Sequence, residues 1–251
     1  MPKHRPSSPS SAPFAHDAPE PRVHVKDTPD GKVLFVDGSH ASEWQPERAV
    51  THSIWDLLAA PVMLLPAERV PRVLLMGIGG GTVLRVLRAL RPDASLTGVE
   101  LDADVVAAAR SAFALDALGA TIVVDDAQRF VAQTPARAAF DLIIDDVYQG
   151  QVGAMFKPEG WEVTLRRCFA RLSADGVLVC NVLTRREEPT LADVAAGRVG
   201  VKLCHRDYHN RILVLGKRRE FEPRGVRAAL ASAELLAPVL RRSSVNACDF
   251  T

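Results

Sequence analysis

Short apolar runs alternate with segments whose apolar residues recur at helical spacing over much of the chain. A short apolar run bounded by polar residues predicts a buried strand, and recurrence every three to four residues predicts a helix with one buried face. This pattern predicts strands at residues 72–76, 96–100, 121–124, 140–144 and 177–182, separated by helices at 82–91, 103–114, 127–133 and 161–172. Strands that alternate with helices form a parallel, doubly wound sheet with right-handed crossovers.

The last two predicted strands, 199–207 and 211–217, are separated only by the polar link 208–210. So short a connection makes a hairpin and not a crossover, and we expect one antiparallel edge strand. A helix with one apolar face follows at 225–241, and we predict that residues 242–251 form a loose tail. The pattern as a whole predicts an α/β fold on a doubly wound, mostly parallel seven-stranded sheet with an antiparallel edge hairpin.

The N-terminal part of the chain has a different pattern. Residues 1–21 hold six prolines and several serines but few large apolar residues, which is typical of a disordered tail. Residues 22–66 predict a short N-terminal β segment, in which a β-hairpin turns at 29–31 and a helix covers 47–65. We assign residues 67–241 to the main α/β domain.

Composition narrows the functional classes. The net charge of +1 gives no electrostatic reason to expect nucleic acid as a partner. No apolar run reaches the ~18 residues that span a bilayer, and residues 1–21 lack the apolar core of a signal peptide, so we expect a cytoplasmic protein without a membrane partner. Cys168, Cys180, Cys204 and Cys248 show no CxxC motif and no pairing with histidine, which predicts reduced, structural thiols and no metal site.

A glycine-rich turn joins the first strand of the main domain to its helix, in residues 72–82 (RVLLMGIGGGT). A strand, a glycine turn and a helix together bring backbone N–H groups and a helix N-terminus close to a ligand. The next strand ends in Glu100, 23 positions after Gly77, which is the placement of an acid that binds both hydroxyls of a ribose. We therefore predict a cofactor that carries a nucleoside.

Acidic residues follow three successive strands: Glu100, the pair Asp125 and Asp126, and the pair Asp145 and Asp146. In an open parallel sheet, ligands bind outside the carboxyl ends of the strands, so these acids are expected to line one crevice. Each single acid could instead cap the helix that follows it. The sequence contains no GxSxG turn, no HExxH motif and no P-loop lysine, so other catalytic classes have no signature here.

Two classes of cofactor fit a glycine turn followed by an acidic residue that binds ribose. In a dinucleotide-binding GxGxxG motif the third glycine would fall at position 82, which is Thr82. This departure, together with the antiparallel hairpin, favours S-adenosylmethionine or a relative over NAD. In that class Asp126 or its neighbour would hold the adenine amino group.

Four motifs, at residues 72–82, 99–102, 124–127 and 140–146, occur in the order and at the spacing of one known family. In these motifs the chain resembles the spermidine synthase family of aminopropyltransferases over roughly residues 22–216. Members of that family have the class I methyltransferase fold preceded by a small β domain, which residues 22–60 match in shortened form. The resemblance implies a methyltransferase-like, cofactor-binding domain.

The resemblance also implies residue roles. The cofactor, S-adenosylmethionine or its decarboxylated form, would contact Gly77, Gly79, Gly81, Glu100, Asp126 and Ala127. Glu100 would bind the ribose hydroxyls, and Asp126 with Ala127 would face the adenine. Asp146 would deprotonate the attacking amine.

The chain departs from the family at two acids that contact cationic groups. Gln149 stands where the family has a second acid for the polyamine, and Gly80 stands where the glycine turn of the family carries an aspartate. Tyr148 is a candidate for substrate contact and equally a half-buried aromatic that packs the loop after it. Trp161 is expected to anchor that loop in the core, and His205 and His209 are expected to be exposed.

The leading hypothesis is a spermidine synthase-like transferase that acts on an amine through Asp146, with Tyr148 as a second candidate catalytic residue. A methyltransferase acting on a small molecule is the alternative, favoured because Gly80 and Gln149 replace two acids of the family. A cofactor-binding protein without turnover, acting as an oligomer partner, also remains open, and a homodimer is possible. An NAD-dependent oxidoreductase is the least favoured class.

Overall fold

A computed structural model describes residues 20–135, 140–195, 199–217 and 220–249. The tail predicted at residues 1–21 lies almost entirely outside the described residues. The described chain is built around an eight-stranded sheet of order β11-β9-β10-β8-β7-β4-β5-β6. Its strands are β4 (Arg72–Met76), β5 (Ser95–Glu100), β6 (Thr121–Val124), β7 (Phe140–Asp145), β8 (Leu172–Val182), β9 (Val199–His205), β10 (Arg211–Gly216) and β11 (Ser243–Asp249).

The strand order confirms the predicted α/β fold. Strands β4, β5, β6, β7 and β8 pair in parallel, and the crossovers between them carry helices. Strands β9 and β10 form the predicted antiparallel hairpin. However, the reversed strand β10 lies between β8 and β9, so it is inside the sheet and not at its edge.

The prediction of a loose tail at residues 242–251 was wrong. Residues Ser243–Asp249 form β11, which pairs antiparallel with β9 along its whole length, from Ser243 opposite His205 to Asp249 opposite Val199. This strand makes the sheet eight-stranded where seven strands were predicted. The segment SSVNACD has no apolar run, so its strand conformation comes from backbone pairing and from Val245, which packs against the core.

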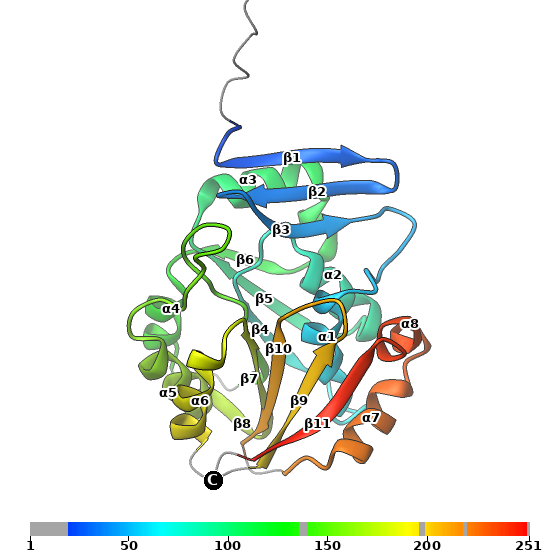
Figure 1. Cartoon of the computed structure of the whole chain (residues 1–251), viewed down its shortest axis with the longest axis vertical. Helices are drawn as coiled ribbons and strands as arrows, with labels where there is room; N and C mark the ends of the chain where they lie inside the picture. Colours follow the sequence, from blue (N-terminus) through cyan, green and yellow to red (C-terminus); the bar gives the residue numbers. More distant parts are fainter. Residues whose placement is uncertain (1–19, 136–139, 196–198, 218–219, 250–251) are drawn as a thin grey trace, which may run out of the picture.

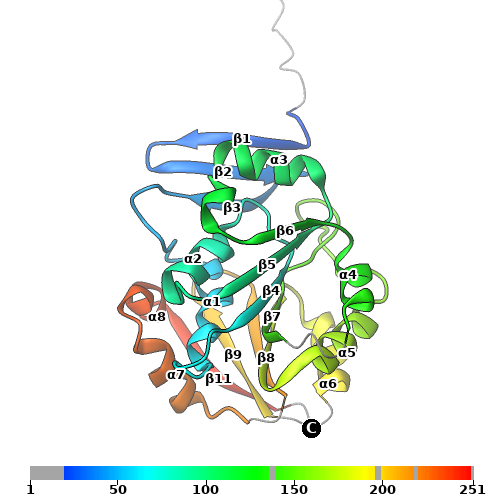
Figure 2. The same cartoon turned by 180° about the vertical axis from the view of Figure 1, so that it is seen from behind.

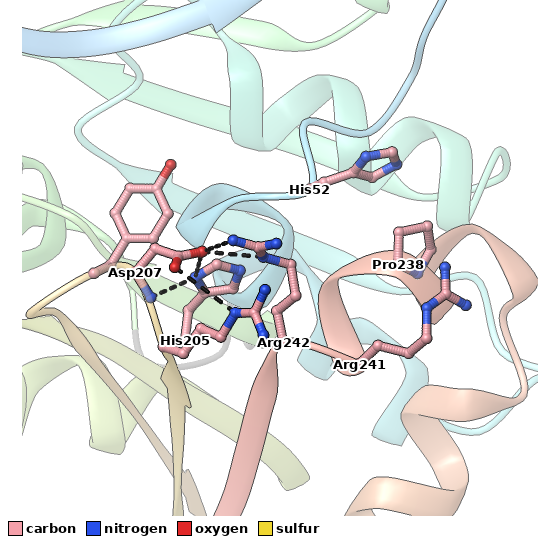
Figure 3. A pocket seen from close by; sticks show the side chains of 8 residues that line it. His52, His205, Asp207, Pro238, Arg241 and Arg242 are labelled. Carbon is pink, nitrogen blue, oxygen red and sulfur yellow. Dashed lines mark hydrogen bonds and ion pairs between the residues drawn. The ribbon is translucent and has the colours of Figure 1, made fainter.

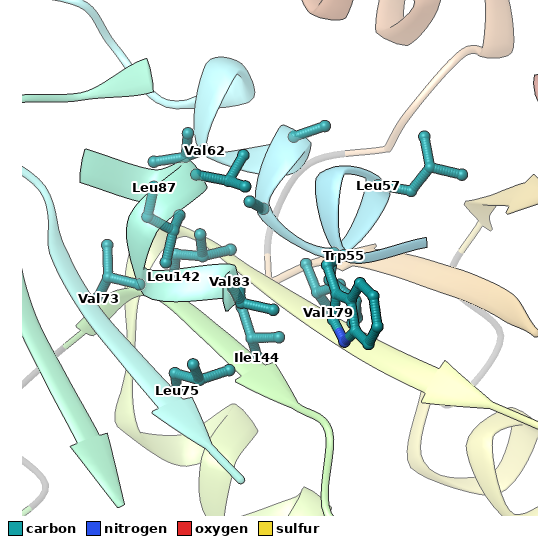
Figure 4. Close-up of a cluster of buried hydrophobic side chains, with 14 of the residues drawn as sticks. Trp55, Leu57, Val62, Val73, Leu75, Val83, Leu87, Leu142, Ile144 and Val179 are labelled. Atoms are coloured by element: carbon teal, nitrogen blue, oxygen red, sulfur yellow. The ribbon is translucent and has the colours of Figure 1, made fainter. Parts of the chain in front are cut away.

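Helices cover both faces of the sheet (Figure 1). Alternate residues of each buried strand point to opposite faces, so Val73 and Leu75 of β4 join one core cluster while Leu74 and Met76 join the other. Figure 4 shows the first cluster, in which Leu142 and Ile144 of β7 meet side chains of α1 and α2. The helices are α1 (Ile54–Ala59), α2 (Thr82–Leu90), α3 (Ala103–Ala112), α4 (Ala127–Gln133), α5 (Trp161–Arg171), α6 (Glu188–Ala195), α7 (Pro223–Ala231) and α8 (Ala237–Leu240), with short 3-10 helices at Ala60–Leu64, Leu115–Leu118, Arg185–Glu187 and Glu234–Leu236.

The single helix predicted at 225–241 is therefore divided into α7, a 3-10 turn and α8. None of the helices in the described ranges is long and apolar enough to cross a membrane.

A separate three-stranded sheet lies at one end of the molecule, beside α3 (Figures 1 and 2). The predicted hairpin forms its strands β1 (Val23–Thr28) and β2 (Gly31–Val36), and the sequence did not predict the third strand, β3 (Ser39–Trp44). Strand β3 has the sequence SHASEW, which shows neither an apolar run nor clear alternation, and its conformation follows from pairing with β2. Leu34 of β2 packs with Val105 and Phe113 from the α3 region.

The helix predicted at 47–65 is shorter than expected, because the α-helical part covers only Ile54–Ala59 and a 3-10 helix continues to Leu64. The side chain of Asp56 explains where the helix begins. Its carboxylate accepts hydrogen bonds from the backbone N–H groups of Thr51 (2.9 Å) and His52 (2.8 Å), which hold that segment in a non-helical turn.

Candidate active site

The predicted acids lie at the carboxyl ends of β7, β5 and β6. These strands and β4 are parallel neighbours in the order β7-β4-β5-β6, so their carboxyl ends lie on the same side of the sheet. Backbone hydrogen bonds tie these strand ends together. The N–H of Gly77 donates to the carbonyl of Val99 (2.9 Å), that of Asp125 to Glu100 (2.9 Å), and that of Asp146 to Met76 (3.0 Å). The strands that carry the three groups of acids are therefore neighbours in the sheet, and that the acids line one crevice remains a prediction.

The glycine turn adopts a conformation that requires glycine. Gly77, Gly79 and Gly81 have φ angles of +82°, +50° and +86°. A Cβ atom at Gly77 would lie 2.7 Å from the carbonyl oxygen of Asp146. The glycine turn and Asp146 are thus in direct contact through their backbones.

Glu100 lies against the glycine turn. One of its carboxylate oxygens, Oε2, accepts the N–H groups of Ile78 (3.1 Å) and Gly79 (3.2 Å), and Oε1 accepts the N–H of Asp102 (3.3 Å). Burial raises the pKa of Glu100, and these backbone hydrogen bonds oppose that increase. A ribose bound to Glu100 would share the carboxylate with the N–H groups of the turn.

Asp126 caps a helix in this structure. Its Oδ1 accepts the backbone N–H of Arg129 (2.9 Å) in the first turn of α4, which is the capping interpretation allowed by the sequence. Its neighbour Asp125 accepts the backbone N–H of Asp126 (2.6 Å) and forms an ion pair with Arg129. Asp126 and Ala127 thus begin α4 beside Glu100, and their role toward adenine remains a prediction.

Asp146 is held by a short chain of amides. The Nδ2 of Asn181, near the end of β8, donates to Oδ1 of Asp146 (2.6 Å), and the Nδ2 of Asn210 donates to Oδ1 of Asn181 (2.9 Å). The bond from Asn210 orients the amide of Asn181 so that its NH2 group faces Asp146. Desolvation raises the pKa of Asp146 to about 7, although the bond from Asn181 and the ammonium of Lys157 both act to lower it.

A buried lysine lies beside this carboxylate. The Nζ of Lys157 contacts Oδ2 of Asp145 (2.9 Å) and the carbonyl oxygen of Val147 (3.1 Å), so one ammonium binds the residues on both sides of Asp146. The side chains of Lys157 and Asp145 are 5% and 2% exposed. The ammonium also lies 4.1 Å from the ring centre of Tyr148 and 5.1 Å from that of Trp161.

Trp161 completes this buried cluster. Its Nε1 donates to Oδ2 of Asp145 (2.7 Å), and its side chain is in the core, as the sequence predicted. The sequence did not identify Lys157, because the polar loop 149–160 gave no sign that this lysine is buried. Asn181 directly follows the apolar run VLVC at the same edge as the acids, so its place in the pattern could have indicated its role.

The hydroxyl of Tyr148 has three protein partners. It donates toward Oε2 of Glu187 (2.9 Å) and the carbonyl oxygen of Asn181 (3.1 Å), and it accepts from the N–H of Leu183 (2.9 Å). Burial and the nearby Glu187 raise the pKa of Tyr148. These contacts support the packing interpretation of Tyr148, and substrate contact remains a prediction.

Strand β3 covers the glycine turn. The N–H of Gly80 donates to Oγ of Ser42 (2.7 Å), and the Oγ1 of Thr82 donates to the carbonyl oxygen of Glu43 (2.7 Å). A Cβ atom at Gly80 would lie 2.9 Å from Cβ of Ser42 and 3.0 Å from the ring of Phe113. Ser42 and Phe113 therefore fill the space that the side chain of an aspartate at position 80 would occupy.

The two histidines beside the β9–β10 hairpin differ. His209 is exposed as predicted, but the prediction for His205 was wrong, because its side chain is buried beneath the link between β9 and β10. It stacks edge-on against Tyr208, with ring centres 5.1 Å apart. The sequence does not reveal this burial, and it did not predict β11, whose Ser243 lies opposite His205 of β9.

The chain matches known proteins at the level of sequence and of fold. A family model described as a spermine/spermidine synthase domain matches residues 54–193, more than half of the chain. The polyamine aminopropyltransferase 1 of Pseudomonas aeruginosa is 31% identical over 160 residues, which cover 59% of this chain and 51% of that protein. That of Pseudomonas syringae pv. tomato is 29% identical over 180 residues, covering 67% of this chain and 58% of that protein. The chain thus spans about half the length of the curated relatives it matches.

Solved structures share the fold. A probable spermidine synthase from Corynebacterium glutamicum has a TM-score of 0.71 at 22% identity, covering 89% of this chain and 86% of that chain. The spermidine synthase of Thermotoga maritima has a TM-score of 0.59 at 18% identity, with coverages of 88% and 84%. Human methyltransferase-like protein 13, in complex with SAH, has a TM-score of 0.59 at 21% identity, with coverages of 75% and 90%. The family match and the methyltransferase-like fold agree with the resemblance found in the four sequence motifs, and the chain belongs to the spermine/spermidine synthase family.

Proposed function

We propose that this protein is a transferase that binds S-adenosylmethionine or its decarboxylated form and transfers an aminopropyl group to an amine, with Asp146 as the base. The observation that carries this proposal is a carboxyl group with a pKa of about 7, held by Asn181 at the carboxyl edge of the sheet and in backbone contact with the glycine turn. Relatives named polyamine aminopropyltransferases support the same class of reaction.

The residues around the glycine turn fit an adenosyl group. Gly77 is in contact with the backbone of Asp146, and the carboxylate of Glu100 lies against the N–H groups of Ile78 and Gly79 in the same turn. Glu100 would hold the ribose hydroxyls, and Asp126 with Ala127 would face the adenine. When bound, this cofactor supplies a carbon attached to a sulfonium, at which a nucleophile displaces the sulfur.

Asp146 would prepare the nucleophile. A protonated amine has no lone pair for displacement, so it must lose a proton before it attacks. A base works best when its pKa lies near the operating pH, and a pKa of about 7 meets this condition. Asn181 binds Oδ1 of Asp146, and Lys157 binds the side chain of Asp145 and the carbonyl oxygen of Val147, so these two side chains would act as positioning residues for the carboxylate.

Methyl transfer to a small molecule is the second candidate, and a specific observation favours it. Ser42 and Phe113 fill the space beside Gly80, and Gln149 is an exposed amide, so the described residues offer no carboxylate at either position for a cationic group. By the resemblance, the acid missing at position 149 would bind the polyamine, and the acid missing at position 80 would bind the aminopropyl amine of the decarboxylated cofactor. Each missing charge-assisted contact would weaken the binding of its amine by about 1.5–3 kcal/mol. Methyl transfer from S-adenosylmethionine to a small molecule needs neither of these contacts.

The direct test incubates the full chain with decarboxylated S-adenosylmethionine and a panel of monoamines and diamines, and measures release of methylthioadenosine. We expect release that falls by at least about a hundredfold in Asp146→Asn and is unchanged in Asp193→Asn, which alters an exposed carboxylate on α6. Release that is equal in the two variants would exclude Asp146 as the base. A parallel incubation with S-adenosylmethionine measures release of S-adenosylhomocysteine, and transfer in that incubation alone would establish methyl transfer. Binding of either cofactor without any transfer would indicate a non-catalytic homologue.

A further inference from the structure

A pocket of about 810 Å³ opens outside the site described above, beside the link between β9 and β10 (Figure 3). Three segments line it: the turn before α1, the link itself and the end of α8. The lining residues are His52, His205, Arg206, Asp207, Tyr208, Pro238, Arg241 and Arg242. It belongs to the α1 and α8 side of the sheet, away from α5.

The lining carries more positive than negative charge, since three arginines share it with one carboxylate. Asp207 is the partner of Arg242, whose Nε lies 3.0 Å from Oδ2, and Arg206 lies 3.7 Å from its other oxygen. The bond from Arg242 lowers the pKa of Asp207, so this carboxylate is ionised near neutral pH. The side chain of Arg241 forms no hydrogen bond or ion pair with any residue in the described ranges, and it is exposed.

His205 provides a second, independent observation at the floor of this pocket. Its Nδ1 accepts the backbone N–H of Asp207 (3.2 Å), so the proton of the neutral ring is on Nε2. The side chain is 1% exposed, and Nε2 has no hydrogen-bond partner among the residues that the structure describes. A buried N–H donor without an acceptor is unfavourable, and a ligand oxygen that reached Nε2 would remove that cost.

We propose that this pocket binds a phosphate group, either as the free ion or as part of a phosphorylated molecule. Three guanidinium groups against one carboxylate leave an excess of two positive charges, which matches a dianion. Planar guanidinium groups bind phosphate oxygens well, and Arg242 already directs two of its N–H groups at one anionic oxygen, Oδ2 of Asp207. The volume exceeds that of a single phosphate, so the pocket has room for an organic part. This assignment is independent of the proposed transferase function.

The test is a calorimetric titration of the full chain with inorganic phosphate at constant ionic strength. We expect saturable binding with one site per chain, weakened at least about tenfold in Arg241→Gln, because a charge-assisted hydrogen bond contributes about that factor. Arg241 has no partner to lose, so this variant should fold normally. The matched control is Arg167→Gln, which removes the same charge from an exposed site on α5 and should change the affinity less than about twofold.

Two further titrations distinguish a free phosphate ion from a phosphorylated molecule, and this pocket from the candidate active site. A phosphate monoester such as glycerol 3-phosphate would bind more tightly than inorganic phosphate if the natural ligand is organic, and equally if it is the free ion. Phosphate affinity should not change when methylthioadenosine is present. The proposal is overturned if no saturable binding occurs, if the two variants behave alike, if acetate binds as tightly as phosphate, or if methylthioadenosine displaces the phosphate.

Discussion

Replacing Asp146 by asparagine should make the folded protein more stable at neutral and alkaline pH. The pKa of Asp146 is about 7 in the folded chain, against an ordinary value of 3.8. Between these two values the folded state binds more protons than the unfolded state, so the stability of the native protein falls as the pH rises. Above pH 7 the cost of the desolvated charge is present in full, and asparagine does not carry it.

The magnitude follows from the same pKa difference. A gap between 3.8 and about 7 corresponds to at most about 4 kcal/mol, because each tenfold change in an equilibrium constant is about 1.4 kcal/mol. Since the side chain is half-buried and not sealed from water, we expect roughly half of this upper bound, ~2 kcal/mol. The asparagine keeps an acceptor oxygen for Nδ2 of Asn181, so the hydrogen bond is preserved.

Urea denaturation followed by circular dichroism at a series of pH values between 4 and 8.5 provides the assay. The free energy of unfolding of Asp146→Asn minus that of the native protein should be near zero at the acidic end and rise to ~2 kcal/mol above pH 7. Asp193→Asn is the control, and its curve should run parallel to that of the native protein. If the free energy of unfolding of Asp146→Asn also ran parallel to that of the native protein across the whole pH range, the argument that desolvation raises the pKa of Asp146 would be refuted.

Three further predictions concern the neighbours of this carboxylate. Lys157→Met should lower the free energy of unfolding by about 3–5 kcal/mol in urea titrations, because it leaves Asp145 charged and buried; the double variant with Asp145→Asn should regain most of this loss, and no recovery would contradict the pairing. Gly80→Asp should cost about 1–3 kcal/mol through its clash with Ser42 and Phe113; Ser42→Gly should restore part of it, and a neutral Gly80→Asp would show that β3 does not close this space. Glu100→Gln should weaken methylthioadenosine binding about tenfold or more in calorimetry, whereas an unchanged affinity would remove Glu100 from the proposed pocket.

Much of the central sheet could be predicted because its strands are short apolar runs separated by helices. The buried strands β4 and β7 need apolar residues on both sides, and the positive φ angles after β4 need glycines, so both leave a clear sequence signal. Strands β3 and β11 leave none, because SHASEW and SSVNACD take their conformation from a neighbouring strand. Strand β3 pairs with β2 across a short turn, and β11 pairs with β9, which is distant in the sequence; neither pairing is visible in the local pattern of apolar residues.

The site was predicted in the same uneven way. Glu100 is the last residue of β5 and Asp146 is the first residue after β7, so the rule for strand ends located them. Lys157 lies in a polar loop, and its burial depends on the aromatic rings and the carboxylate that the fold brings around it. His205 likewise lies in β9, opposite β11, a strand that the sequence did not predict.

The central claim is that the edge formed by the glycine turn, Glu100 and Asp146 binds an adenosyl sulfonium cofactor. Its most direct test is a calorimetric titration of the full chain with S-adenosylmethionine, its decarboxylated form, methylthioadenosine and NAD, repeated with Glu100→Gln. We predict saturable binding, one ligand per chain, of methylthioadenosine and of at least one sulfonium form, with much weaker binding in the variant. Binding of NAD alone, or of none of the four ligands, would contradict the account.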